Sequence, residues 1–461
     1  MPIRGLGYGL ATVIGFVLAL AAVVSVLALG GVETLAFAPA QIAVVILATV
    51  VFWREGFPPV SRPTRWVLAV LLAVPILQLI PLPRSVVAAV FPARVYLGDS
   101  LLSGLVPLPG NLSLTVNSYG TRLALLNLVC YVLVFLLAFH AYRSRRVPAG
   151  LIGVLMTLGV LEAAYGIFQY LTGWQYIFFY RKLLYTQEAT GTYVNRNHFA
   201  GLLEMVLPFL LAGLVLRRWT QENRGRAVWV QIFVSPWTSR LLRDLVPFAL
   251  IFVALVFSRS RMGLLAAILG LLVVGAIAFL QTRRLSMLVL LGLVLAVPLA
   301  YSVWIGLNPV IERFEVLGQP HALEEDRLPV WRDTVALIRD YPFFGTGLGT
   351  YLWANQHYQS SKLYGYYEHA HSDYLEFAAD IGIPATVVLF FGLWVLVVKT
   401  GSCALLLERS REKILAAGCA GAMAAILVHG ITDFNLQIPA NAFLFSWIAG
   451  TAAGLVAKRN V

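Results

Sequence analysis

Two arginine-containing stretches of this 461-residue sequence have the composition of an anion-binding site. The first, GTYVNRNHFAGLLE at 191–204, places Arg196 between Asn195 and Asn197, just before a long apolar run. A guanidinium group can bind a phosphate through two parallel hydrogen bonds, and the free N–H groups at a helix start attract the same anion. We therefore expect Arg196 to bind a phosphate or diphosphate, with Asn195 and Asn197 as further substrate ligands. The alternative is that Arg196 only marks where the apolar run meets water.

The second stretch, SRSRMG at 258–263, places two arginines in a tight turn between two apolar runs. Either Arg259 or Arg261 could bind the same anion as the first stretch. The competing interpretation is ordinary contact with lipid headgroups.

A third stretch, EHAHSDYLE at 368–376, carries two histidines. Because the pKa of histidine is near neutral, such a side chain can accept a proton from a hydroxyl group at physiological pH. His371 is the candidate for this role, and His369, Asp373 and Tyr374 are candidate substrate ligands. Two residues apart, the histidines would point to different faces of a helix, so they do not predict a shared metal ion. A purely structural role for either histidine is the alternative.

A fourth stretch, HGITDFNLQIPAN at 429–441, places His429 and Asp433 four residues apart. This spacing permits metal binding, but a structural hydrogen-bonded pair is the favoured interpretation. The three cysteines have no CxxC or Cys/His ligand spacing. We therefore expect no metal site, no disulfide framework and no cofactor.

The elements that position these residues follow from composition, because 59% of the residues are apolar and only 12% are charged. So few polar residues could not cover the surface of a soluble protein of this length. Apolar runs of about 20 residues are long enough to cross a bilayer as helices. The sequence thus predicts an all-α integral membrane protein with about twelve transmembrane helices, at 8–30, 36–53, 65–82, 121–141, 149–171, 198–216, 245–258, 262–282, 285–306, 381–399, 414–430 and 442–457.

The charges predict the orientation of these helices. When the N-terminus is placed in the cytoplasm, most of the 34 Lys and Arg residues fall in cytoplasmic loops and most of the 22 acidic residues fall elsewhere. This is the bias of multi-pass membrane proteins, so both termini are expected in the cytoplasm. The net charge of +12 is then explained by topology, and we expect no nucleic-acid partner.

Three segments on the opposite, extracytoplasmic side are longer than a connection needs: 83–120, 172–197 and 307–380. The longest is expected to be a partly helical functional loop between a first region at 1–306 and a last region at 381–461. Within it, RLPVWRDTVALIRDY at 327–341 is expected to form an amphipathic helix, whose apolar face carries Leu328, Trp331, Val335 and Ile338. The following GTGLG is expected to form a plain turn, because it lacks the preceding strand and the lysine of a nucleotide-binding loop.

Taken in order, these stretches resemble the O-antigen ligase/polymerase family of bacterial envelope glycosyltransferases. LQLIPLP at 77–83 and YGIFQY at 165–170 belong to the same pattern, which extends over most of the chain. The resemblance implies an inner-membrane enzyme of the GT-C type that works without a metal. Such enzymes take a glycan from undecaprenyl diphosphate on the periplasmic side of the membrane.

The resemblance also implies roles for particular residues. The essential histidine of the family corresponds to His371, and its diphosphate-binding arginines correspond to Arg196 and Arg261, with Arg259 as the competing register. Arg327 matches a family arginine that precedes the tryptophan of the long loop. Ser372 stands where asparagine is common in the family.

Two branches of the family remain open. A ligase delivers the glycan to lipid A–core, and a polymerase delivers it to another lipid-linked repeat unit. The sequence favours the ligase only slightly. A lipid-linked glycan flippase and an assembly scaffold are less favoured, because the polar residues gather at one face and one long loop and not at mid-membrane in two halves.

Overall fold

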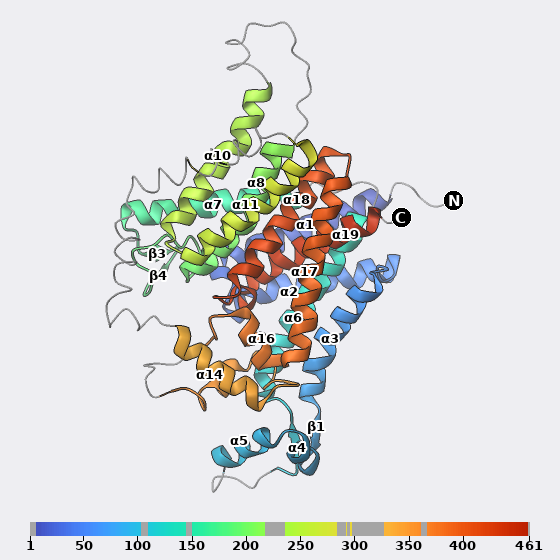
Figure 1. Ribbon diagram of the computed structural model, residues 1–461, viewed down its shortest axis with the longest axis vertical. Coiled ribbons are helices and arrows are strands. Elements are labelled where there is room, and N and C mark those ends of the chain that lie inside the picture. Colours follow the sequence, from blue (N-terminus) through green and yellow to red (C-terminus); the bar gives the residue numbers. More distant parts are fainter. Residues whose placement is uncertain are drawn as a thin grey trace, which may run out of the picture.

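The computed structural model describes residues 6–102, 109–143, 150–216, 236–283, 327–360 and 367–459, together with the single positions 292 and 296. The protein is an all-α integral membrane protein (Figure 1). The helices are α1 (Leu6–Leu27), η1 (Leu29–Gly31), α2 (Thr34–Glu55), α3 (Arg62–Leu79), α4 (Arg84–Val90), α5 (Pro92–Leu102), α6 (Ser118–Arg143), α7 (Gly150–Thr172), α8 (Arg196–Leu216), α10 (Pro236–Phe257), α11 (Arg261–Thr282), α14 (Arg327–Asp340), α15 (Tyr351–Asn355), α16 (Asp373–Ile381), α17 (Ile383–Leu406), α18 (Ser410–His429), η4 (Asn435–Gln437) and α19 (Pro439–Arg459).

Strands in the described residues form two small antiparallel sheets. In the first, β1 (Pro81–Pro83) pairs with β2 (Asn111–Ser113), and Leu82 lies opposite Leu112. In the second, β3 (Tyr176–Ile177) pairs with β4 (Tyr180–Arg181). Strands β2, β3 and β4 lie in segments that the sequence places between membrane spans, whereas β1 takes up the end of the predicted span 65–82, because α3 ends at Leu79.

Among the described residues, 10 helices are long and apolar enough to cross a membrane. They are α1, α2, α3, α6, α7, α8, α11, α17, α18 and α19, and each corresponds to a predicted span. The predicted span 245–258 is part of α10, which begins earlier, at Pro236. The predicted span 285–306 lies outside the described residues, apart from positions 292 and 296.

The centre of the bundle is α8, which is buried along its whole length from Asn197 to Leu216. Helices α10, α11 and α18 pack around it, and α8, α11 and α18 lie close together in Figure 1. Small residues permit this packing, because helices in lipid associate where their backbones can approach closely. Gly418 of α18 faces the ring of Phe209, and Gly270 of α11 faces the backbone of Gly421.

Gly450 provides a test of this packing. A Cβ atom at Gly450 of α19 would lie 2.3 Å from the backbone oxygen of Phe135 in α6, and a backbone atom cannot move aside as a side chain can. We expect Gly450→Ala to lower the free energy of unfolding by about 1–3 kcal/mol through overpacking. Thermal unfolding in detergent measures this. Gly153→Ala is the matched control, because a Cβ atom at Gly153 meets nothing within 4 Å.

Helices α4, α5, α14 and α16 gather at one end of the molecule, at the bottom of Figure 1. Gln78 at the end of α3 joins this region to the bundle, because its amide donates to the backbone oxygen of Asp380 and accepts from the N–H of Leu348. The GTGLG segment forms a turn, as the sequence predicts. Its Gly349 N–H donates to the carboxylate of Asp380 over 2.6 Å, so the turn is filled by a residue of the protein itself.

The helix predicted at 327–341 is α14, but its buried face differs from the predicted apolar stripe. Val330, Thr334 and Leu337 are buried. Leu328 and Val335, which the spacing assigns to the apolar face, are 58% and 37% exposed. The reason is tertiary: the hydroxyl of Thr334 bonds to that of a buried tyrosine in α15, which turns this polar position inward.

Candidate functional site

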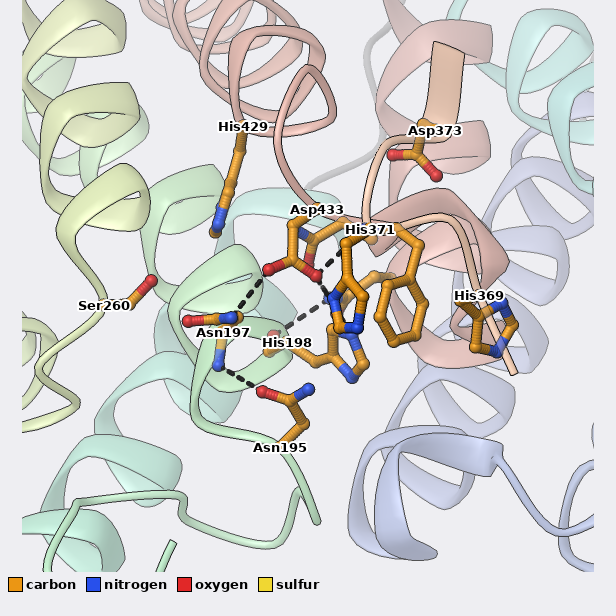
Figure 2. Close-up of polar contacts among 12 residues, drawn as sticks. Asn195, Asn197, His198, Ser260, His369, His371, Asp373, His429 and Asp433 are labelled. Atoms are coloured by element: carbon orange, nitrogen blue, oxygen red, sulfur yellow. Dashed lines mark hydrogen bonds and ion pairs between the residues drawn. The ribbon is translucent and has the colours of Figure 1, made fainter. Parts of the chain in front are cut away.

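The loop between α18 and α19 holds a buried carboxylate, Asp433, at the centre of the site (Figure 2). Its Oδ2 atom accepts hydrogen bonds from Asn197 Nδ2 over 2.6 Å and from an Arg327 nitrogen over 3.0 Å. Its Oδ1 atom accepts from the N–H of Phe434 over 2.9 Å. Arg327 also donates to the carbonyl oxygen of Thr432. Asp433 therefore joins α8, α14 and its own loop.

The charge of Asp433 is stabilised by these partners. His198 Nε2 lies 3.6 Å from Asp433 Oδ1. Burial alone would raise the pKa of Asp433, but the nearby His198 and the charges of His429 and Arg327 outweigh it and hold the pKa well below its ordinary value. Asp433 is thus an anion at neutral pH.

A second polar pair lies next to this cluster in the bundle. Nδ1 of His429, at the end of α18, is 2.9 Å from Oε2 of Glu204 in α8, and both side chains are fully buried. The sequence favoured a His429–Asp433 pair, and this interpretation is wrong for the side chains: His429 bonds to Glu204, and Asp433 bonds to residues of α8 and α14.

The ring of Phe434 contacts three histidines. His369 stacks on it with ring centroids 4.0 Å apart, and the rings of His371 and His198 meet it edge-on at 5.1 and 4.6 Å. The two histidines of the EHAHSDYLE stretch therefore lie beside the loop that carries Asp433, as Figure 2 shows.

His371 has the environment of a neutral proton acceptor. Its Nδ1 atom is buried and has no hydrogen-bond partner among the described residues. Burial lowers the pKa of His371 to about 4. Its backbone φ of 50° lies in the left-handed region, which is strained for a histidine and is found most often at functional sites. The Trp331 indole of α14 lies 3.4 Å from the carbonyl oxygen of His371 and donates to it.

His369 is different, because its Nδ1 atom lies 2.7 Å from Oε1 of Glu376. Burial alone would lower the pKa of His369, but the charge and hydrogen bond of Glu376 outweigh it and raise the pKa. His369 therefore holds a proton more readily than His371 does. The structure thus distinguishes two histidines that the sequence treated alike.

Arg196 lies at the first turn of α8. The side chain of Asn195 caps this helix, because its Oδ1 atom accepts from the N–H of Asn197 over 2.8 Å. The guanidinium of Arg196 bonds to Glu188 Oε1 over 2.8 Å and lies over the ring of Tyr185. Both Glu188 and Tyr185 belong to the segment between α7 and α8.

The start of α11 lies directly against α8. Ser260 caps α11 by accepting from the N–H of Gly263. A Cβ atom at Gly263 would lie 2.6 Å from Ala200 of α8 and 3.3 Å from the ring of His429. The N-terminal ends of α8 and α11, each bearing a candidate arginine, are therefore side by side. Arg261 is exposed at this helix start.

Arg259 precedes the α11 cap with a φ of 53°, and its guanidinium lies over the ring of Tyr170, 5.7 Å from the centroid. The Arg259 side chain therefore faces α7. Its strained backbone lets the turn between α10 and α11 stay tight.

Two further candidates have structural contacts. The carboxylate of Asp373 accepts from the N–H of Leu436 over 3.1 Å and is fully buried, so it holds the loop that carries Asp433. The hydroxyl of Tyr374 donates to the carbonyl oxygen of Leu427, and its ring stacks on Phe390 of α17.

The structure thus brings Asn197, Arg327, His369 and His371 into one cluster and places Arg196 and Arg261 at adjoining helix ends. The sequence singled out Asp433 only as a partner for His429 and did not identify it as the carboxylate that binds Asn197 and Arg327. The signal for it was an acidic residue at the end of an apolar run, where charges are costly. Within the described residues, no group of three or more His, Cys, Asp or Glu side chains could hold a metal ion.

Fold and site together define a multi-pass membrane protein with a cluster of histidines and arginines at one end of the helix bundle. Residues 246–390 match the family model described as O-antigen ligase. The match runs from α10 into α17 and contains Arg259, Arg261, Arg327 and His371. This match supports the resemblance to the O-antigen ligase/polymerase family that the sequence motifs implied. A comparison with curated proteins gives no match.

Proposed function

We propose that the protein is an O-antigen ligase that transfers a glycan from undecaprenyl diphosphate to a hydroxyl group of lipid A–core. The reaction takes place on the periplasmic face of the bacterial inner membrane, with both termini in the cytoplasm, and needs no metal ion. The observation that carries the proposal is His371, whose buried Nδ1 atom has no hydrogen-bond partner among the described residues. It lies in the same cluster as Arg327 and Asp433.

In the proposed reaction, the acceptor oxygen attacks the anomeric carbon of the lipid-linked sugar. The acceptor O–H proton passes to the imidazole ring of His371, and the bond between the anomeric carbon and the phosphate oxygen breaks. The electron pair of that bond leaves on the diphosphate, and the proton later passes from His371 to solvent. A single displacement of this kind inverts the configuration at the anomeric carbon.

The arginines stabilise the leaving group in this proposal. Arg196 and Arg261 bind the diphosphate, whose negative charge increases as the glycosidic bond breaks. The N-terminal ends of α8 and α11 add the favourable end of two helix dipoles. Because α8 and α11 are in contact where they begin, one diphosphate can reach both helix ends. Arg327, fixed by Asp433 and 32% exposed, supplies a further contact to substrate.

Removing either arginine is expected to reduce transfer. Each of Arg196→Ala and Arg261→Ala should lower kcat/KM by about 10²-fold or more, the usual effect of losing one group that stabilises charge in a transition state. Lysine at either position should restore only part of the activity, because it cannot bind a phosphate through two parallel bonds. Arg332→Ala, an exposed position of α14, is the control. An Arg261→Ala variant with full activity would remove this residue from the diphosphate site.

The pKa of His371 predicts the pH profile of the donor-free enzyme. Because this pKa is about 4, His371 is neutral from pH 8 down to pH 5, and kcat/KM should fall only below that range. A bound diphosphate should raise the pKa by its negative charge, so the acid limb of kcat should lie at higher pH. Initial rates at saturating and limiting donor measure both limbs. A kcat/KM limb centred near 6.5, the value for an exposed histidine, would contradict this environment.

The linked effect on stability has a definite sign. The folded protein binds a proton at His371 less readily than the unfolded chain does. The free energy of unfolding is therefore unaffected by His371 above about pH 6.5, and it decreases as the pH falls from there towards 4.

The polymerase branch is the alternative, because the family match does not separate the two branches. The purified protein in lipid should be given an undecaprenyl-diphosphate-linked glycan of several repeats, with EDTA, in the presence or absence of lipid A–core. Product that forms only with lipid A–core supports a metal-independent ligase. A ladder of longer lipid-linked chains in the donor-only sample supports the polymerase. A requirement for added divalent metal contradicts the metal-free reaction, and movement of the donor between leaflets without product supports a flippase.

A further inference from the structure

A cavity of about 700 Å³ lies on the side of the bundle between α3 and α17, with α6 and α19 as its floor. Its volume is within the roughly 300–1,000 Å³ typical of sites for small molecules. Most of its lining is apolar and includes Leu71, Phe135, Phe139, Leu396, Phe445 and Ala453. None of the candidate catalytic residues lines it.

The rim of this cavity faces the surroundings of the bundle. Trp66 of α3 and Phe391 of α17 line the cavity and are 72% and 71% exposed. The two helices come close where a Cβ atom at Gly392 would lie 2.9 Å from Val67. In a membrane, an apolar cavity with such a rim is open to lipid chains. An acyl chain can therefore enter it from the bilayer.

The end of the cavity that is distant from the candidate site is cationic. Lys399 and Arg459 both line the cavity, and no carboxylate of the described residues forms an ion pair with either. Lys458, next in sequence to Arg459, is paired with Glu412 over 2.7 Å. At this end of α19, the cation that lines the cavity is therefore the one without an ion pair among the described residues.

The geometry of the helices places these two cations on either side of one level. Cys403 Sγ of α17 lies 3.9 Å from the carbonyl oxygen of Leu455 in α19. Lys399 is about one helical turn before this contact and Arg459 about one turn after it. The hydroxyl groups of Ser61, Thr64 and Ser402 also line the cavity. Two long cationic side chains thus bracket a level at which hydroxyl donors are available.

We propose that this cavity binds an anionic glycerophospholipid. Its acyl chains occupy the apolar part between α3 and α17, and its phosphate lies between Lys399 and Arg459. The two cations and the hydroxyl groups supply the charge and hydrogen bonds that a phosphodiester headgroup needs. This site is separate from the glycan-transfer reaction and does not depend on which branch of the family the protein represents.

The position of the charges favours a phospholipid over the polyprenyl tail of the donor. Phe377 and Leu436 line the cavity near the candidate site, so a tail could enter from that end. Lys399, however, lies about 24 Å further along α17 than Ile383, at roughly 1.5 Å per residue. A polyprenyl tail is uncharged at its far end and would leave both cations without a partner.

Native mass spectrometry of the full-length protein in detergent tests the proposal. The protein is incubated with phosphatidylglycerol, with phosphatidylcholine of the same acyl chains, or with undecaprenol. We expect phosphatidylglycerol to be retained about 10-fold or more over phosphatidylcholine. The double variant Lys399→Gln/Arg459→Gln should lose this preference. The double variant Arg54→Gln/Arg411→Gln removes two exposed charges outside the cavity lining and should keep it.

A second variant separates the cavity from the surface charge. Ser446→Phe fills the apolar floor without changing a charge, and it should reduce retention of phosphatidylglycerol while both cations remain. Equal retention of the two phospholipids by the unmodified protein would overturn the proposal, and this comparison needs no variant to fold. Retention of undecaprenol that displaces phosphatidylglycerol and is insensitive to Lys399→Gln/Arg459→Gln would assign the cavity to the donor tail instead.

Discussion

Replacing His371 with asparagine is expected to lower the rate of glycan transfer by about 10²–10⁴-fold, the usual contribution of a positioned proton acceptor. Asparagine is the informative replacement because His371 has a φ of 50°, and asparagine adopts the left-handed region more readily than most residues. The variant therefore keeps the backbone and the contact between the Trp331 indole and the residue 371 carbonyl, and removes only the ring.

The measurement for His371 must separate catalysis from binding. Single-turnover transfer gives the chemical step, and binding of the lipid-linked donor is measured in parallel. We expect the rate constant to fall while donor affinity changes little, because the proton leaves the acceptor and not the donor. His357→Asn, an exposed histidine of the same long loop, is the matched control. A His371→Asn variant that transfers glycan at the normal rate would exclude this residue as the base.

Replacing Asp433 with asparagine is expected to have the second-largest effect, although the change is isosteric. Asp433 accepts hydrogen bonds at both carboxylate oxygens: from Asn197 and Arg327 at Oδ2, and from the Phe434 N–H at Oδ1. An asparagine amide replaces one of these oxygens with a donor, so in either orientation it faces another donor. The charge that balances Arg327 is lost as well.

The size of the Asp433 effect follows from its burial. Removing one partner of a buried ion pair usually costs about 3–5 kcal/mol. Arg327 keeps partial access to solvent, so we expect the lower part of this range and a fall in transfer of about 10²-fold. Because Asp433 acts through Arg327, the double variant Asp433→Asn/Arg327→Ala should be little worse than the more severe single variant.

Asp340→Asn serves as the control for the Asp433 variant, since Asp340 is an exposed carboxylate on α14. Thermal unfolding distinguishes a loss of fold from a loss of site geometry. Strictly additive effects in the double variant would show that Asp433 and Arg327 act independently, and the proposed positioning role would then be wrong.

Hydrogen bonds of Asn441 hold the loop that carries Asp433 in place. Asn441 at the start of α19 donates to the carbonyl oxygen of His198 and to Oδ1 of Asn435, and accepts from the hydroxyl of Tyr193. Gly201 of α8 lies so close that a Cβ atom there would be 2.1 Å from the Asn435 side chain. The loop that carries Asp433 is therefore fixed from α8, α16 and α19 at once.

The sequence by itself determined the class of the protein and most of its spans. Long apolar runs bury themselves in lipid wherever they occur, so their number and order can be predicted without tertiary information. The ends of the helices were less certain, because a helix can continue beyond its apolar run. α10 begins at Pro236 and continues through the ion pair of Arg243 and Asp244, where the apolar run is interrupted but the helical hydrogen bonds are not. The resemblance to a family could also be predicted from the sequence, because the motifs occur in a characteristic order along the chain.

Only the tertiary structure decided which polar residues meet. Asn197, Arg327 and Asp433 are each separated by more than one hundred residues along the chain, yet Asn197 and Arg327 bond to the same carboxylate oxygen of Asp433. His369 and His371 look equivalent in sequence, but only His369 reaches Glu376. Hydrophobicity and periodicity describe how each helix faces its surroundings. The pairing of buried charges depends on how the helices cross, and a single sequence does not contain that geometry in readable form.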